Sequence, residues 1–130
     1  GRYDFSASRL REAEPVPEFL LVAREAAAAF AGLAPEDLAQ AMVTEYAPGA
    51  GIGWHRDRPE FDKVVGLSFV SEATMRFRRR RGEGWERAAL PLAPGSAYLL
   101  DGAARQDWQH SIAPGETLRY SVTFRSLRRP

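Results

Sequence analysis

Hydrophobic residues recur with helical spacing in only one part of the chain, residues 18–31. Pro17 suits the first turn of a helix, Glu18 favours the positive end of the helix dipole, and Gly32 is a typical C-terminal stop. The pattern therefore predicts one helix that packs against a sheet. Its predicted apolar face consists of Phe19, Leu20, Ala23, Ala27 and Phe30.

From Met42 onward the pattern changes to short hydrophobic runs separated by glycine and proline, which is typical of β-strands. A strand-like piece also occurs at residues 3–5, and residues 35–38 predict a single further helical turn. The number and spacing of the runs indicate a mainly β (α+β) fold, a sandwich or jelly roll with an N-terminal supporting helix. The predicted strands lie near Met42–Tyr46, Gly51–His55, Val64–Val70, Thr74–Arg80, Trp85–Leu90, Ala97–Leu100 and Arg119–Arg125.

Composition narrows the possible chemistry. The 130 residues correspond to one domain, 1–130, which is long enough to bury a core. There is no cysteine, which excludes disulfides, zinc–thiolate sites and thiol catalysis and favours a cytoplasmic setting. No run approaches the length of a membrane span, and a net charge of +1 does not by itself indicate a nucleic-acid binder.

The chain contains only two histidines, His55 and His110, and an aspartate, Asp57, follows the first of them by two residues. Two imidazoles and one carboxylate form the facial triad that suits non-haem Fe(II). Residues two apart in a strand point to the same face, about 6.5 Å from each other, so one strand could present His55 and Asp57 while a second strand presents His110. The alternative is that an isolated His-x-Asp pair consists of ordinary surface residues.

Arg119, Ser121, Thr123 and Arg125 alternate with apolar residues on the last predicted strand and so share one face. Two guanidinium groups in one cleft suit an organic diacid held by bidentate pairing. Alternation also places Met42, Thr44 and Tyr46 on one face of the strand that precedes the histidine strand. The competing interpretation makes the arginines a solvated edge.

Three segments together resemble one known family, the AlkB-type Fe(II)/2-oxoglutarate dioxygenases. They read Glu45-Tyr46-x-Pro48-Gly49-x-Gly51-Ile52-x-x-His55-x-Asp57, then His110-Ser111-Ile112, then Arg119-Tyr120-Ser121-Val122-Thr123-Phe124-Arg125. The resemblance implies a double-stranded β-helix that holds iron through His55, Asp57 and His110. It further implies that Arg119 and Tyr46 bind the distal carboxylate of 2-oxoglutarate, and that Arg125, Ser121 and Thr44 complete this pocket.

The cofactors implied by the resemblance are Fe(II), 2-oxoglutarate and O2. The implied activity is oxidative demethylation of alkylated nucleobases in single-stranded DNA or RNA, with release of formaldehyde, by a monomeric enzyme. Two alternatives stay open at this point. One is an oxygenase that acts on a protein or a small molecule, and the other is a non-catalytic jelly-roll binding module.

The sequence departs from the family pattern at positions that bear on the substrate. Thr44 stands where asparagine is common, and the run after Asp57 leaves only Glu60 as a carboxylate that could read a base. Only 54 residues precede His55. We therefore expect that the nucleotide-recognition lid of the repair members is either absent from this chain or not used.

Three further side chains, Trp108, Arg76 and Arg105, are candidates for substrate contacts. Trp108 could line the mouth of the site, and Trp54 favours packing over stacking on a base. Arg76, with Arg78 and Arg80, gives one strand a basic side that suits phosphate or is simply solvated. Arg105, in the loop before His110, is a candidate for contacts with the substrate or with the backbone.

Overall fold

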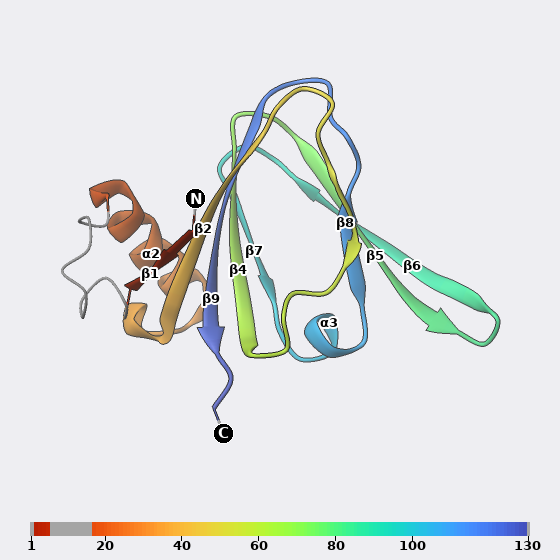
Figure 1. Cartoon of the computed structure of the whole chain (residues 1–130), viewed down its shortest axis with the longest axis horizontal. Coiled ribbons are helices and arrows are strands. Elements are labelled where there is room, and N and C mark those ends of the chain that lie inside the picture. Colours follow the sequence, from red (N-terminus) through yellow and green to blue (C-terminus); the bar gives the residue numbers. More distant parts are fainter. Residues whose placement is uncertain (1, 6–16, 130) are drawn as a thin grey trace.

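The computed structural model describes residues 2–5 and 17–129, which fold into two antiparallel β-sheets and a helix packed against one of them (Figure 1). The helical elements are α2 (Glu18–Ala31), the 3-10 turn η1 (Pro35–Asp37) and α3 (Ala103–Gln106). The strands are β1 (Arg2–Asp4), β2 (Leu38–Tyr46), β3 (Ile52–His55), β4 (Phe61–Phe69), β5 (Ala73–Arg81), β6 (Gly84–Leu92), β7 (Ser96–Leu100), β8 (Gln109–Ile112) and β9 (Arg119–Leu127).

The two sheets face each other across the space that holds the candidate site. The larger has the order β1-β2-β9-β4-β7 and the smaller the order β3-β8-β5-β6. Consecutive strands repeatedly cross from one sheet to the other, as in a jelly roll, and the β5–β6 hairpin extends beyond the body of the molecule (Figure 1). The predicted mainly β fold with a supporting N-terminal helix is confirmed.

Helix α2 covers the outer face of the five-stranded sheet. Leu20, Ala27 and Ala28 are fully buried there against residues such as Val65 and Phe124. The predicted helical face was wrong at Phe19 and Phe30, which are 58% and 54% exposed. Both lie about 80–100° around the helix from Leu20, and the small alanines of the central stripe make the contact with the sheet instead.

The predicted strands all occur, each with somewhat different ends, and the strand-like piece at residues 3–5 corresponds to β1. Two elements have no counterpart among the predicted ranges. The helix α3 has only four residues, too few for a hydrophobic period, and β8 is equally short. Both lie just before or at His110. The expectation that a second strand presents His110 is confirmed by β8, although the hydrophobic pattern gave no range for that strand.

A second apolar cluster fills part of the space between the sheets. It joins Val64, Tyr98 and Leu100 of the larger sheet to Met75 and Ile112 of the smaller one. The remaining inward positions are polar, and they form the site. Among the described residues, no helix is long and apolar enough to cross a membrane.

Candidate metal and co-substrate site

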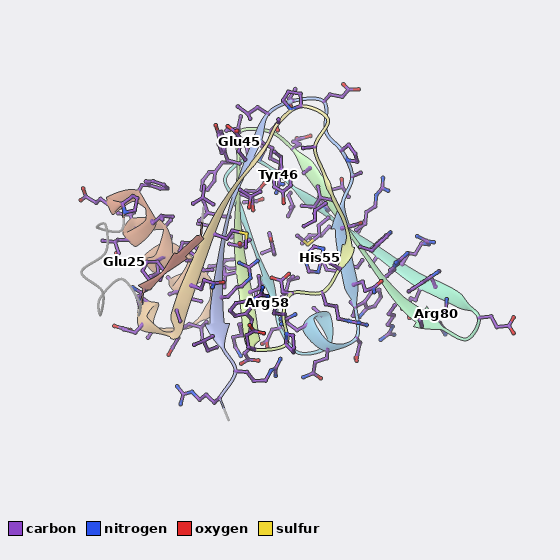
Figure 2. The ribbon with its side chains drawn as sticks, in the orientation of Figure 1. Glu25, Glu45, Tyr46, His55, Arg58 and Arg80 are labelled. Atoms are coloured by element: carbon purple, nitrogen blue, oxygen red, sulfur yellow. The ribbon has the colours of Figure 1, made fainter. Side chains whose placement is uncertain are left out.

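The side chains of His55, Asp57 and His110 converge between the sheets (Figure 2 labels His55). Oδ1 of Asp57 lies 3.4 Å from Nε2 of His55 and 3.5 Å from Nε2 of His110. Neighbouring ligands of an octahedral ion at about 2.1 Å lie about 3 Å apart, so a small closure would bring all three atoms onto one ion. The spacing fits a two-histidine, one-carboxylate metal site.

The two histidines are adjacent because β3 and β8 pair with His55 opposite His110. Nδ1 of His55 donates to the carbonyl of Gly53, 2.9 Å away, which leaves Nε2 as the free lone pair that a metal needs. Asp57, however, lies two residues beyond the end of β3. The expectation that one strand presents His55 and Asp57 was therefore wrong, because the chain leaves the sheet after His55 and a loop brings the carboxylate back.

Asp57 is fixed from its other side by Arg125, whose Nε donates to Oδ2 at 2.8 Å. Burial alone would raise the pKa of Asp57. The neighbouring His110 and His55 rings, together with the charge and hydrogen bond of Arg125, outweigh burial and hold the pKa of that carboxyl well below its usual range. The carboxylate is thus ionised, with one oxygen paired to Arg125 and the other facing the histidines.

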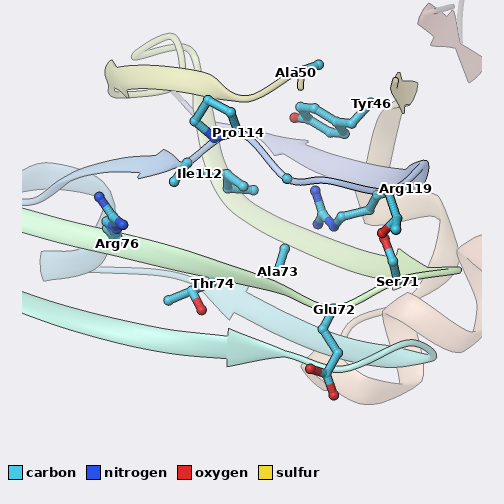
Figure 3. A pocket seen from close by; sticks show the side chains of 13 residues that line it. Tyr46, Ala50, Ser71, Glu72, Ala73, Thr74, Arg76, Ile112, Pro114 and Arg119 are labelled. Carbon is cyan, nitrogen blue, oxygen red and sulfur yellow. The ribbon is translucent and has the colours of Figure 1, made fainter. Parts of the chain in front are cut away.

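Arg119 lies further along the cavity, beside Tyr46 (Figure 3). Its Nε donates to the hydroxyl of Ser68 at 3.2 Å, and its guanidinium carbon lies 5.1 Å from the centre of the Tyr46 ring. Nη1 and Nη2 are buried, and no hydrogen-bond partner for them occurs in residues 2–5 and 17–129. Two parallel, buried and unpaired N–H donors match a carboxylate in bidentate geometry.

The cavity between Arg119 and the histidines has a volume of about 340 Å³. Burial raises the pKa of Tyr46 against the opposing charge of Arg119, so its phenol is a neutral hydrogen-bond donor. The predicted co-substrate residues Thr44, Ser121 and Arg125 line this cavity, and the adjoining pocket of about 250 Å³ contains Arg119. The structure thus brings every predicted metal and co-substrate residue to one continuous space.

Tyr98 and Gly66 belong to this space but were missed in the sequence. They are opposite each other on β7 and β4, and Gly66 is opposite Thr123 on β9. A Cβ at Gly66 would overlap the phenol end of Tyr98, so the ring lies across the place of the missing side chain. Tyr98 thereby lines the metal cavity, and burial raises the pKa of its hydroxyl. A glycine inside an apolar strand was the available signal.

The loop that carries Asp57 is held by Arg105, a buried residue of α3. Its guanidinium donates to the carbonyls of Arg58, Phe61 and Asp62 at 2.9, 2.7 and 3.1 Å, and more distantly to that of Asp57 at 3.5 Å. Of the two predicted roles, the backbone contact is the one observed. The prediction of a substrate contact was wrong, because the guanidinium faces the loop and not the cavity.

The remaining predicted substrate residues lie outside the metal cavity. Glu60 is exposed and pairs with Arg58 at 3.7 Å. Trp108 is covered by Arg79, 4.8 Å from its ring centre, and lines neither cavity. Arg76 reaches the rim of the pocket that holds Arg119. The substrate roles of these three residues stay predictions.

Comparisons with known proteins agree with the geometry. A family model described as "2OG-Fe(II) oxygenase superfamily" matches residues 1–125. The similar curated proteins include uncharacterized protein L905 of Acanthamoeba polyphaga mimivirus, which is 32% identical over 101 residues, covering 68% of this chain and 48% of L905.

Two further relatives are AlkB homologues. The bovine mitochondrial alpha-ketoglutarate-dependent dioxygenase alkB homolog 7 is 36% identical over 98 residues, covering 74% of this chain and 43% of the relative. The Arabidopsis thaliana alkylated DNA repair protein ALKBH8 homolog is 32% identical over 117 residues, covering 75% of this chain and 34% of the relative. The chain therefore spans less than half the length of each of these three relatives.

Solved structures with a similar fold include an oxalate oxidase in complex with glycolate, with a TM-score of 0.53 and 15% identity over 70% of this chain and 43% of that one. A predicted oxalate decarboxylase from Thermotoga maritima has a TM-score of 0.51 and 17% identity, covering 72% and 70% of the two chains. At this identity the likeness establishes the jelly-roll fold alone.

Proposed function

The chain belongs to the 2OG-Fe(II) oxygenase superfamily as an AlkB-like member, and from this premise we propose that it oxidatively demethylates alkylated nucleobases in DNA or RNA. The cofactors of the superfamily are Fe(II), 2-oxoglutarate and O2, and the residues present fit them. The observation that carries the oxygenase chemistry is the pair of donors on Arg119 that have no partner among the described residues, in a pocket that shares Tyr46 and Ile112 with the cavity of the three converging metal ligands.

When bound, the iron and 2-oxoglutarate supply an oxidation in which O2 converts an N-methyl group to N-hydroxymethyl while 2-oxoglutarate becomes succinate and CO2. The hydroxymethyl group then leaves the nitrogen as formaldehyde. Protein side chains contribute position and charge to this reaction and supply no redox group of their own.

The residues of the chain divide this work between the two sheets. His55 and His110 on the smaller sheet would offer their Nε2 atoms to the metal, and Asp57 would offer one oxygen because Arg125 occupies the other. A single carboxylate and two imidazoles leave an Fe(II) site with a net positive charge and open positions. Arg119 and Tyr46 on the larger sheet would hold the far carboxylate of 2-oxoglutarate.

A nucleobase substrate is supported by two further observations. The cavity opens beside His55, whose side chain is 31% exposed, at the exposed backbone of Gly51, Ile52 and Gly53. A planar base that carries a methyl group can approach this edge without displacing the core. In addition, one relative carries the name alkylated DNA repair protein.

The test measures formaldehyde and succinate from the purified chain with Fe(II), ascorbate, 2-oxoglutarate and a panel of methylated mononucleosides and oligonucleotides. We expect both products in equal amounts, and no product from Asp57→Ala. Asp62→Ala is the matched control, because Asp62 lies nearby at the start of β4, is solvent-accessible, and among the described residues pairs through its side chain with Lys63 and Arg128.

Methylated peptides form the contrasting arm. Formaldehyde from peptides but not from nucleobases would replace the proposed substrate with a protein while leaving the oxygenase chemistry intact. Succinate production that persists in Asp57→Ala would contradict the metal assignment itself. No succinate from any substrate, with no metal-dependent rise in melting temperature, would instead favour a non-catalytic binding module.

A further inference from the structure

The outer face of the four-stranded sheet, opposite to the face with the histidines, carries an uncompensated row of arginines. We call it the outer arginine face. Strand pairing places Arg76 opposite Ala89, Arg78 opposite Arg87 and Arg80 opposite Trp85. The outer arginine face consists of Trp54, Thr74, Arg76, Arg78, Arg80, Trp85, Arg87, Ala89 and Gln109.

The charge of this face is not neutralised locally. On the other face of the same hairpin, Glu86 pairs with Arg79 at 2.8 Å and with Arg81 at 3.7 Å. The strand positions of the outer arginine face include no aspartate or glutamate. Glu72, just before β5, lines a pocket with Arg76, but within residues 2–5 and 17–129 no acidic side chain forms an ion pair with any of the four arginines of the outer arginine face. This excess of positive charge favours an anionic ligand.

Tryptophan rings hold part of this face in a fixed arrangement. The guanidinium carbon of Arg78 lies 4.4 Å from the ring centre of Trp54 and 4.1 Å from that of Trp85, and its Nε donates to Gln109 at 2.8 Å. Arg80 lies 4.8 Å from the same Trp85 ring. A guanidinium stacked between two aromatic rings keeps its outer N–H edge available for a second ligand.

A pocket of about 370 Å³ lies on the same face. Trp54 forms an aromatic wall, Arg76 and Arg87 supply positive charge, Thr74 supplies a hydroxyl, and no acidic residue lines it. The volume falls within the range of about 300–1,000 Å³ that small-molecule sites occupy. An aromatic wall beside two guanidinium groups fits a base with its phosphate.

We infer that the outer arginine face binds a single strand of nucleic acid, with its phosphates on Arg76, Arg78, Arg80 and Arg87 and one nucleotide in the pocket beside Trp54. Successive arginines on one face of a strand stand about 6.8 Å apart. This is wider than the 3.4 Å rise per phosphate of a stacked duplex strand, so an extended single strand matches better. The identity of the polymer rests on the proposed function.

The position of β3 connects this face to the metal cavity. It is the edge strand of the sheet, and its adjacent residues Trp54 and His55 point to opposite faces. Ile52 and Gly53 beside them are exposed. A strand bound on the outer face can therefore pass over this edge and place a base in the cavity without crossing another element.

The experiment measures fluorescence anisotropy of labelled, unmethylated 12-mers of deoxythymidine and uridine against the full chain over a series of salt concentrations. In Arg76→Gln/Arg87→Gln, the slope of log K against log salt should fall by about 1.4, because each phosphate contact on a single strand contributes about 0.7. The same relation gives a loss of affinity of about 25-fold at 0.1 M salt. Melting temperatures verify that the variants fold.

Arg79→Gln/Arg81→Gln is the matched control, with the same charge change on the same hairpin but at arginines that pair with Glu86. It should bind with nearly the original affinity. An equal loss in both double variants would overturn the assignment to the outer arginine face. Two outcomes would overturn the assignment of a single-stranded nucleic acid as the ligand. One is that polyglutamate displaces the labelled 12-mer as well as an unlabelled 12-mer does, and the other is that a duplex binds more tightly than the single strand.

Failure of this inference is distinguishable from failure of the proposed function. Demethylation of a methylated mononucleoside needs the cavity but not the outer face. If mononucleosides are demethylated and oligonucleotides bind without salt dependence, the function stands and the surface does not. If oligonucleotides bind through the four arginines and no methylated base is oxidised, the inference about the outer arginine face holds and the proposed demethylation does not.

Discussion

The guanidinium of Arg119 is the single group whose environment depends most on a ligand. It is 4% exposed, and two of its nitrogens have no partner in the described part of the chain. A buried charge without a partner lowers stability, whereas a bound carboxylate satisfies it. The free chain therefore retains an unfavourable charge at the position that we propose for the co-substrate carboxylate.

Arg119→Gln should separate the contribution of Arg119 to 2-oxoglutarate binding from its effect on the stability of the free chain. Truncating one partner of a buried charged pair costs about 3 kcal/mol, so we expect the KM for 2-oxoglutarate to rise roughly 150-fold. The melting temperature of the ligand-free variant should not fall, because the unpaired charge is gone. Steady-state kinetics and thermal melts measure the two quantities, with Arg79→Gln as a surface control. A small change in KM would place the carboxylate elsewhere.

Gly66 makes a second residue-level prediction. In Gly66→Ala the new methyl group collides with the Tyr98 ring, which is enclosed between the sheets. Overpacking of this kind costs about 1–3 kcal/mol, and the phenol must leave the cavity, so 2-oxoglutarate should also bind more weakly. Urea unfolding and calorimetry measure both effects.

The double variant Gly66→Ala/Tyr98→Leu provides the control. If the ring causes the cost, Gly66→Ala should destabilise much less in the Tyr98→Leu background than in the original chain, as a double-mutant cycle would show. Equal costs in both backgrounds would mean that Gly66 is required for its backbone and not for Tyr98.

Residue chemistry explains which site positions were predictable. His55, Asp57, His110, Arg119 and Arg125 were identified because few residue types bind a metal or a diacid, and because they recur at strand spacing. Tyr98 was not identified, since a tyrosine in an apolar strand usually belongs to the core. Its role depends on a gap in the neighbouring strand, and one strand alone cannot reveal such a gap.

At the scale of elements, the loop after β3 determines where Asp57 lies. Besides Arg105, Arg128 donates from Nε to the carbonyl of Pro59 at 3.0 Å and from Nη2 to that of Phe61 at 3.2 Å. The backbone N–H of Arg128 donates to the carbonyl of Glu60 at 2.7 Å. The loop is thus fixed by donors from α3 and from the end of β9 and not by strand pairing.

Replacing Arg105 should therefore weaken the metal site through its position. Arg105→Gln leaves buried carbonyls unpaired, which we expect to cost about 2–4 kcal/mol of stability. We also expect Mn(II) to bind at least about tenfold more weakly, a difference of about 1.4 kcal/mol, because Asp57 is no longer held. Calorimetry on the folded variant measures the affinity separately from stability.

Arg128→Gln is the matched control for this prediction, since Arg128 contacts the same loop from a more exposed position, farther from Asp57. It should affect Mn(II) affinity less than Arg105→Gln does. Similar affinities for all three proteins would show that Arg105 stabilises the fold without positioning the ligand. Because these contacts join segments more than 40 residues apart, the pattern of hydrophobic positions could not have predicted them.

The helix and long strands were predictable for the opposite reason. Residues 18–31 carry a helical period and end at a left-handed Gly32, and polar and apolar residues alternate in β9 from Arg119 to Arg125, so local pattern and tertiary contacts agree. The local pattern and the tertiary contacts disagree at Phe19 and Phe30. Both are large apolar residues of the kind found in cores, but they lie beside the narrow alanine stripe that touches the sheet and are exposed.

At the scale of the whole molecule, the site is divided between two sheets that share few strand-to-strand contacts. The candidate metal ligands His55 and His110 belong to the smaller sheet, and Arg119 and Arg125, the proposed co-substrate residues, belong to the larger one. Asp57 with Arg125 is the polar link between them. The sequence identified both groups, yet their separation onto facing sheets depends on the strand order, which residue patterns leave open.

This division predicts cooperative stabilisation by the two ligands. A metal would be held by His55, Asp57 and His110, on β3, β8 and the loop after β3, whereas 2-oxoglutarate would in addition be held by Arg119 of the larger sheet. Mn(II) and 2-oxoglutarate together should therefore raise the melting temperature by more than the sum of their separate effects. At 100-fold excess over Kd a ligand contributes about 2.7 kcal/mol, or about 10 °C for a chain of this length.

His110→Ala should abolish the effect of 2-oxoglutarate, while Arg119→Gln should retain the metal effect and lose the cooperative part. Additive shifts in the original chain would show that the co-substrate does not span the sheets.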